Sequence, residues 1–280
     1  MRNYWIGVLT LPPLVAWAAL PNAKSTSQTA TALHILDCGE ISVSDQSQFS
    51  PGVNAGKRID LKDTCYVIEH PRGTLMWDTG LPDALAAQPD GARGQTYHVR
   101  RKQTLAAQLE KLGVKPDSVD YIAMSHLHFD HSGNANMFVG PTWLVQKPEF
   151  EAAFSERASQ MGFDSTSYHR LKSKAQQISG DYDVFGDSSV VILSTPGHTV
   201  GHQSLLVRLP SGKILLSGDL WHFRANREHK RVPSFNVDKN QTLSSMERVE
   251  QLLKAHNARL IIQHDPQDVA ALGALPATLR

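Results

Sequence analysis

The chain has 280 residues, 41% of them hydrophobic, which is enough to bury the core of one large domain or of two small ones. Lys and Arg total 28 against 27 for Asp and Glu, so no overall field favours nucleic acid, anionic lipid or a strongly charged substrate. The composition therefore argues against a nucleic-acid-binding protein. Thirteen histidines are more than a chain of this length usually carries, and several of them stand in motifs.

The first 23 residues differ from the rest. One basic residue, Arg2, precedes an apolar run over residues 4–20 that two prolines interrupt. This order is typical of a secretory signal peptide, and the run is short for a membrane span. We expect cleavage after Ala23, a single mature domain over residues 24–280 that is periplasmic or secreted, and no stable membrane insertion after cleavage. An uncleaved membrane anchor and a misassigned start codon are the alternatives.

Antiparallel strands open the mature domain. Apolar segments at Thr31–Asp37, Cys65–His70 and Thr74–Asp78 predict strands, and Pro71-Arg72-Gly73 predicts a hairpin turn between the last two. The only two cysteines are Cys38, which directly continues the first of these segments, and Cys65, which begins the second. They can form a disulfide if the strands are neighbours in an oxidising compartment, and two buried free thiols are an equal alternative. Neither cysteine has zinc-knuckle spacing, so we assign them no metal.

A loop and a helix follow. Residues Leu81–Arg101 show no clear periodicity and predict a loop over the site. Leu105, Leu109 and Leu112 recur at helical spacing, and Gly113 follows as a C-cap.

The next predicted strand, Val119–Ser125, runs directly into HLHFDH at residues 126–131. Side chains two apart on an extended segment point the same way, so His126 and His128 can converge on one ion. Asp130 and His131 lie further along, and one tetrahedral site cannot comfortably take all four. The motif therefore predicts two metal ions sharing one loop, about 3.5 to 4 Å apart as in two-metal hydrolases. A histidine-rich polar loop formed by chance is the alternative.

The second half of the chain supplies more strands and two helices. Pro148 to Gln160 predicts a helix, and the polar residues from there to Gly180 predict a helical insertion. Residues 243–253 predict an amphipathic helix with Glu250 and Lys254 paired on its surface. The order of elements is not a repeating βαβ unit and predicts an α/β fold with two sheets face to face and helices outside. The further strands are expected at Thr142–Gln146, Val190–Ser194, His202–Leu209, Lys213–Ser217 and Arg259–Gln263.

Three more candidate ligands each follow a predicted strand. They are His198, Asp219 and His264. Side chains from the ends of several strands can meet at one edge, which is where functional loops gather. Singly, each residue is more often structural; together with the HLHFDH motif they favour a metal centre.

This pattern, HxHxDH followed by His, Asp and His at separate strand ends, resembles the metallo-β-lactamase superfamily over about residues 32–265. The resemblance implies an αββα sandwich of two mixed sheets flanked by helices, and it includes Asp78-Thr79-Gly80, whose Asp sits beneath the metals in that family. It implies two Zn²⁺ per chain, although His and carboxylate ligands also suit Mn, Fe and Co. The implied ligands are His126, His128 and His198 for one ion, Asp130, His131 and His264 for the other, and Asp219 as the bridge.

Within the superfamily, the chain is similar to the N-acyl homoserine lactonases. The similarity rests on SHLHFDHSG at 125–133, TPGHTVGHQSL at 195–205 and DTGLP at 78–82. It implies a lactonase that opens the ring of N-acyl homoserine lactones by attack of a metal-bridging hydroxide, and so quenches quorum signals. His222 stands where a branch of that family has a tyrosine, three residues after the bridging Asp219. Either His222 donates a hydrogen bond to the substrate or zinc alone polarises the carbonyl.

The roles of several residues stay open. Asp130 either passes a proton to the leaving oxygen or is a ligand only. His202 either supports the metal site or simply begins a strand, and we favour the strand. Basic residues at 224, 227, 230 and 231 predict a solvated loop rather than a nucleic-acid surface.

Other functions compete with the lactonase. A dizinc hydrolase of thioesters, aryl esters or β-lactams would use the same nucleophile. A phosphodiesterase and a non-catalytic zinc protein are further alternatives. We expect a small-molecule lactone or ester as substrate and no nucleic-acid partner, and the sequence allows a homodimer.

Overall fold

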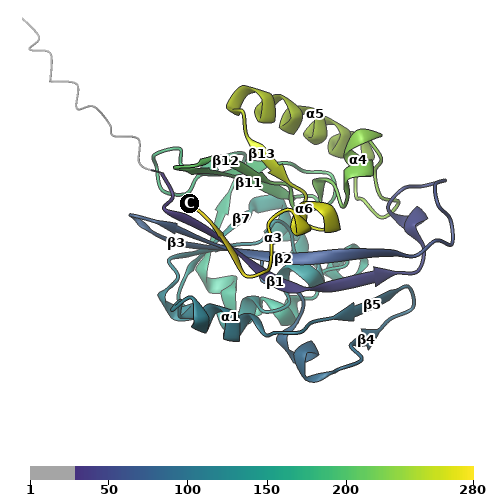
Figure 1. Ribbon diagram of the computed structural model, residues 1–280, viewed down its shortest axis with the longest axis horizontal. Coiled ribbons are helices and arrows are strands. Elements are labelled where there is room, and N and C mark those ends of the chain that lie inside the picture. The colour runs from purple at the N-terminus through teal and green to yellow at the C-terminus, as the bar shows by residue number, and fades with distance from the viewer. Residues whose placement is uncertain (1–28) are drawn as a thin grey trace, which may run out of the picture.

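A computed structural model describes residues 29–280, so the predicted signal peptide lies outside the described residues. Two sheets face each other, helix α5 covers the outer face of one with α4 beside its end, and α1 lies below the other (Figure 1). Each sheet contains both parallel and antiparallel pairs. The predicted α/β sandwich of two mixed sheets flanked by helices is therefore confirmed.

The larger sheet holds nine strands in the order β4-β5-β1-β2-β3-β6-β7-β8, with β14 paired to β1. Its strands are β1 (Ala32–Val43), β2 (Ile59–His70), β3 (Gly73–Trp77), β4 (Ala92–Arg93), β5 (Tyr97–Arg100), β6 (Tyr121–Ala123), β7 (Thr142–Gln146), β8 (Ala175–Ile178) and β14 (Ala277–Leu279). The smaller sheet has the order β13-β12-β11-β10-β9. Its strands are β9 (Tyr182–Asp183), β10 (Val190–Ser194), β11 (Gln203–Leu209), β12 (Gly212–Leu216) and β13 (Arg259–Ile261).

The α-helices connect and cover these strands. They are α1 (Leu105–Lys111), α2 (Phe129–Ser132), α3 (Lys147–Ala153), α4 (Arg224–Glu228), α5 (Lys239–His256) and α6 (Pro266–Ala270). Thr104 caps α1 and Asp238 caps α5, each through a side-chain oxygen that accepts a backbone N–H of the first turn. None of the helices within residues 29–280 is both long and apolar enough to cross a bilayer.

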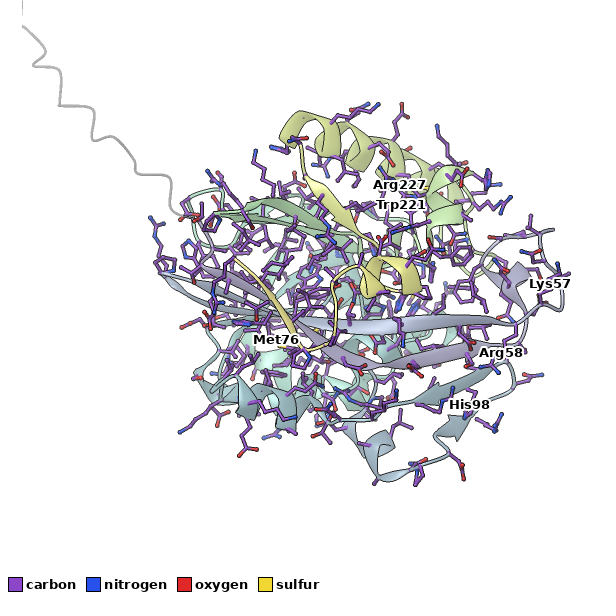
Figure 2. All side chains as sticks on the ribbon, in the orientation of Figure 1. Lys57, Arg58, Met76, His98, Trp221 and Arg227 are labelled. Atoms are coloured by element: carbon purple, nitrogen blue, oxygen red, sulfur yellow. A yellow bond between two sulfur atoms is a disulfide. The ribbon has the colours of Figure 1, made fainter. Side chains whose placement is uncertain are left out.

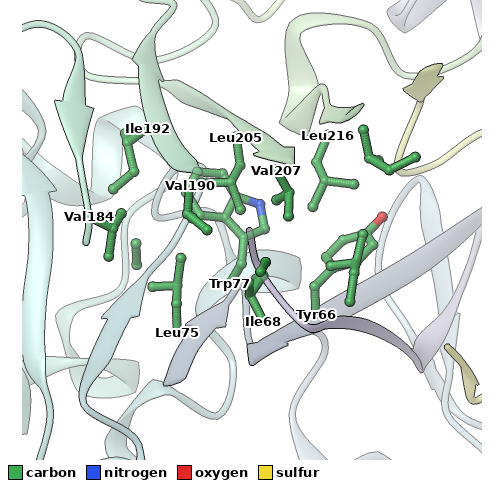
Figure 3. Close-up of a cluster of buried hydrophobic side chains, with 14 of the residues drawn as sticks. Tyr66, Ile68, Leu75, Trp77, Val184, Val190, Ile192, Leu205, Val207 and Leu216 are labelled. Carbon is green, nitrogen blue, oxygen red and sulfur yellow. The ribbon is translucent and has the colours of Figure 1, made fainter. Parts of the chain in front are cut away.

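The main core lies between the sheets (Figure 3). Because successive strand residues point to opposite faces, Tyr66 and Ile68 enter this core while Val67 between them faces the other way. The same alternation gives the central strands, such as β2, two buried faces. Met246 and Val249 of α5 then cover the outer face of the smaller sheet. Burial on both faces explains the nearly continuous apolar runs in the sequence.

Several elements differ from their predicted bounds. The strand expected at Val119–Ser125 is only β6, and the helix expected to reach Gln160 ends at Ala153, after which the chain forms short 3₁₀ helices. The insertion also contains β8, whose Gln176 and Gln177 are exposed, so it lacks the apolar pattern of a buried strand. Residues Leu81–Arg101 are not a plain loop, because they form the β4–β5 hairpin at the edge of the larger sheet.

The two cysteines are joined. Cys38 of β1 and Cys65 of β2 form a disulfide, which settles the alternative of free thiols. Gly80 packs directly on it with a φ of +68°, and a Cβ there would lie 2.3 Å from Cys38 Cβ. Only glycine fits this turn, which follows Asp78 at the end of β3.

Candidate metal centre

The HLHFDH motif straddles the start of helix α2. His128 precedes the helix in an extended conformation, with φ of −67° and ψ of 161°, and Asp130 and His131 lie in the helix itself. The inner nitrogens of His126 and His128 are 2.8 Å apart, so the two side chains converge as predicted. Asp130 and His131 point toward a second, neighbouring group of candidate ligands.

The three remaining candidates arrive from the smaller sheet. His198 follows β10, His264 follows β13, and Asp219 lies in a 3₁₀ helix, Gly218–Leu220, directly after β12. Gly218 has a φ of +54°, and a Cβ there would lie 2.7 Å from His202 Nε2. The chain can therefore bring Asp219 into the centre at this position only with glycine before it.

The seven predicted ligands form two groups. One contains His126, His128, His198 and Asp219; the other contains Asp130, His131 and His264. Asp219 faces both, because its Oδ2 lies 3.2 Å from His198 Nε2 and its Oδ1 lies 2.9 Å from His264 Nε2. All seven are buried except His128, which is half-buried. This is the geometry of one carboxylate shared between two cation positions.

The five histidines share one hydrogen-bonding pattern. Each turns one ring nitrogen into the centre, and the other nitrogen has a partner outside it. Such partners orient imidazoles and fix which nitrogen is free to bind a metal. The outer partners are Ser125 Oγ for His126, Met161 O for His128, Asp78 Oδ2 for His131, Asn236 Oδ1 for His198 and Lys62 O for His264.

The inner nitrogens fit a metal better than they fit one another. Those of His126, His128 and His198 lie 2.8 to 3.2 Å apart. Donors at about 2.0 to 2.1 Å from a tetrahedral zinc ion are separated by about 3.3 Å, so these distances match the edges of such a polyhedron. The residues present therefore fit a pair of divalent ions.

Charge divides the centre into two halves. Burial, reinforced by the neighbouring His198, lowers the pKa of His128 to about 3, so this imidazole is neutral. Burial also acts on His264, but Asp219 outweighs it and raises the pKa of His264 to about 9. The negative field that favours a protonated His264 favours a metal cation at the same place.

Comparison with known proteins agrees with this geometry. The model of the metallo-beta-lactamase superfamily matches residues 60–264, which span every candidate ligand. The chain belongs to the metallo-β-lactamase superfamily. That family matches the fold and the order of ligands that the sequence predicts.

Within the superfamily, similar proteins are named as lactonases. The chain is 34% identical to the N-acyl homoserine lactonase AttM of Rhizobium radiobacter, over 72% of this chain and 81% of the relative. It is 30% identical to the N-acyl homoserine lactonase AiiA of Bacillus thuringiensis subsp. kurstaki, over 89% and 98%. A solved N-acyl homoserine lactone hydrolase with the product N-hexanoyl-L-homoserine at its catalytic metal centre is 27% identical, with a TM-score of 0.75 over 90% of this chain and all of that one.

Asp78 lies beneath the centre, as expected for this superfamily. Its Oδ1 accepts the backbone N–H of Ser125 at 2.6 Å, and its Oδ2 accepts Gln263 Nε2 at 2.7 Å and lies 3.2 Å from His131 Nδ1. One carboxylate thus ties the HLHFDH segment to the segment that ends in His264.

Some residues that support the centre stand in no recognisable sequence motif. Asn236 and the carbonyls of Met161 and Lys62 come from distant segments, and nothing in their local pattern marks them. Glu149 of α3 is buried and accepts hydrogen bonds from Leu127 N, Thr199 Oγ1 and Gly201 N. Glu149 has no local signal either, because the exposed Glu151 of the same helix has the same side chain.

His222 enters the centre differently from the five ligand histidines. Its Nε2 lies 3.0 Å from Asp219 Oδ2, and its buried Nδ1 has no hydrogen-bond partner within residues 29–280. The ring lies edge-on to Phe49 at 4.7 Å and stacks with His264 at 5.8 Å. His222 therefore contacts the Asp219 carboxylate, which faces both groups.

The basic residues near 224–231 are partly neutralised. Arg224 pairs with Asp268, and Arg227 pairs with Glu250 at 2.6 Å, so Glu250 does not form the expected pair with Lys254. Arg227 also lies over the Trp221 ring, and Figure 2 shows the two side by side below α5. The pairing of Glu250 across two helices was not visible in the periodicity of either one.

Proposed function

We propose that the chain is a dizinc lactonase that opens the lactone ring of N-acyl homoserine lactones. The observation that carries this proposal is the shared Asp219 carboxylate, which faces two groups of buried ligands whose histidines are each held from outside. Relatives along almost the whole chain are named as lactonases of these signals. Opening this ring would end the signal, which is quorum quenching.

The proposed site assigns each residue a task. His126, His128 and His198 would hold one ion, Asp130, His131 and His264 the other, and Asp219 would hold both. When bound, two such ions supply Lewis acidity and hydroxide at neutral pH. Asp130 lines the cleft with Oδ2 3.9 Å from His264 Nε2, and this position supports a role in passing a proton to the departing ring oxygen.

The surface around the centre supports an apolar substrate. Three large hydrophobic side chains are exposed among the described residues: Phe129 and Phe235, each at 40%, and Val237 at 49%. All three line one cleft of about 430 Å³ beside His128 and His198. Apolar side chains gathered around a polar centre are typical of a ligand site. No Lys or Arg lines this cleft, which favours an acyl lactone over a phosphodiester.

A substrate panel tests the function. The zinc-loaded mature chain is assayed with N-acyl homoserine lactones, a thioester, an aryl ester, nitrocefin and a phosphodiester. We expect the highest kcat/KM with the homoserine lactones. Turnover confined to nitrocefin or to the phosphodiester would contradict the proposal, and zinc-loaded protein that turns over only the thioester or aryl ester would point to the competing hydrolase.

We also propose that the chain is exported, with residues 1–23 removed and 24–280 forming one domain in the periplasm or medium. The Cys38–Cys65 disulfide supports an oxidising compartment. Extracellular and periplasmic locations are also where diffusible signals are accessible. Amino-terminal sequencing of the periplasmic and secreted fractions should find Lys24 first, and an intact Met1 there would refute the cleavage.

A further inference from the structure

The cleft at the metal centre has a floor and an outer part. The floor is lined by Asp130, Asp219, His222 and His264, and the outer part by Met161 and other residues around it. Four residues line both parts, and they therefore mark the junction: Tyr97, His128, Phe129 and Phe235. A substrate whose ring lies at the floor and whose chain lies in the outer part crosses this junction.

Tyr97 brings the only uncommitted polar group to the junction. Phe129 and Phe235 have none, and both ring nitrogens of His128 are engaged. The Tyr97 hydroxyl has no hydrogen-bond partner in the described part of the chain. At the floor, His222 Nε2 lies 3.0 Å from Asp219 Oδ2, so that nitrogen already has a polar partner.

The backbone holds Tyr97 firmly in this position. Strand β5 pairs with β1, where Tyr97 is opposite Val43, and Gly94 N donates to Tyr97 O at 2.8 Å. The ring lies edge-on to Phe129 at a centroid distance of 6.3 Å. The hairpin at this edge of the sheet also carries His98, which Figure 2 labels near the end of the larger sheet.

The hydroxyl remains a donor across the working pH range. Burial first, and then the charges of Asp130 and Asp219, raise the pKa of Tyr97 to about 12. A neutral phenol in a half-buried cleft donates well to a carbonyl oxygen. In an N-acyl homoserine lactone, the group between ring and chain is an amide with such an oxygen.

We propose that the Tyr97 hydroxyl, at the junction of floor and outer cleft, donates a hydrogen bond to the amide carbonyl oxygen of the N-acyl group. Tyr97 is then a specificity-determining residue that selects acylamino lactones over lactones without the amide. This inference rests on the proposed lactonase function. It adds the recognised group, which neither the metal ligands nor the apolar cleft identifies.

Tyr97→Phe tests the inference because it removes one oxygen and keeps the ring. The two substrates are N-decanoyl homoserine lactone and a γ-butyrolactone that carries an alkyl chain of matched length on the same ring carbon, without the amide. We expect kcat/KM to fall about tenfold for the first, as for loss of one hydrogen bond, and to stay within about twofold for the second. Tyr182→Phe, on the remote strand β9, is the matched control.

Product binding provides a second readout that does not need turnover. The Kd of N-decanoyl homoserine should rise about tenfold in Tyr97→Phe, and the Kd of the amide-free hydroxy acid should not change. An equal loss with both substrates, or no loss with either, overturns the role of Tyr97. Failure of the lactonase proposal is seen separately, because the wild-type enzyme would then open neither lactone.

Discussion

His202 Nε2 accepts the backbone N–H of Asp219 across 2.9 Å. The other nitrogen, Nδ1, lies 3.0 Å from Thr195 O, so Nδ1 carries the hydrogen and Nε2 is the acceptor. Burial first, and then His198, lowers the pKa of His202 to about 3, which keeps this neutral form. His202 both precedes strand β11 and supports the candidate centre, so the two alternatives weighed from the sequence coexist.

His202→Ala should therefore weaken metal binding. Without the imidazole, the buried N–H of Asp219 loses its acceptor, at a cost of about 1 to 3 kcal/mol in the free energy of unfolding. The Asp219 carboxylate is then held less firmly, and zinc affinity should fall about 10- to 100-fold. Competition with a chromophoric chelator measures the affinity.

Two further variants provide a partial rescue and a control for this prediction. His202→Gln offers a side-chain oxygen as acceptor and should recover part of the affinity. His229→Ala removes an exposed imidazole and should leave the affinity unchanged. A loss of stability in His202→Ala with wild-type zinc affinity would restrict His202 to a structural role.

Glu149 should make stability depend on pH. Burial raises its pKa to about 7, above the ordinary 4.5. The folded protein therefore holds this proton more tightly than the unfolded chain, so the stabilising contribution is complete below about pH 4.5 and is lost as pH rises through about 7. The difference in unfolding free energy between wild type and Glu149→Gln should fall by about 3 kcal/mol from pH 4.5 to 8.

Urea unfolding at several pH values measures that difference. Glu151→Gln is the matched control, because Glu151 lies on the same helix but is exposed. Its difference from wild type should not vary with pH. If the free energies of unfolding of wild type and Glu149→Gln differ by the same amount at every pH, the Glu149 carboxyl does not take up a proton on folding.

The candidate ligands could be predicted from the sequence because they stand in local patterns. His126 to His131 are contiguous, and His198, Asp219 and His264 each follow a strand. The groups that orient them are not local: Asn236 lies 38 residues after His198, and Lys62 lies 202 residues before His264. Their pairing depends on how the sheets pack, which no spacing in the chain encodes.

The elements of the fold could likewise be predicted only where a local sequence pattern marks them. Strands buried on both faces, such as β2 and β10, have apolar runs that predict them. The β4–β5 hairpin is short and its strands lack fully buried residues, so its sequence predicts a loop. The hairpin is held in place by pairing with β1, so only the structure could place Tyr97 in the cleft.

The disulfide should contribute substantially to stability. Cys38 and Cys65 are 27 residues apart, and closing a loop of that length in the unfolded chain corresponds to about 3.5 kcal/mol in the chain-entropy model. The Cys38→Ser, Cys65→Ser double variant should lose about that much free energy of unfolding. Denaturation of wild type with and without reductant provides the comparison. Equal midpoints under both conditions would contradict a stabilising contribution of the disulfide.

Removal of metal should destabilise the protein and abolish activity. At free zinc about 100 times each Kd, two sites would add about 5 kcal/mol to the free energy of unfolding, so chelation should lower Tm markedly.

Asp219→Asn keeps one oxygen but replaces the other by an amide NH₂, which does not ligate a cation. Because the two Asp219 oxygens face different ligand groups, this variant should retain about one equivalent of zinc where wild type retains two. Asp181→Asn, at a surface ion pair with Arg248, is the control. Two equivalents of zinc and normal turnover in Asp219→Asn would remove the bridging role.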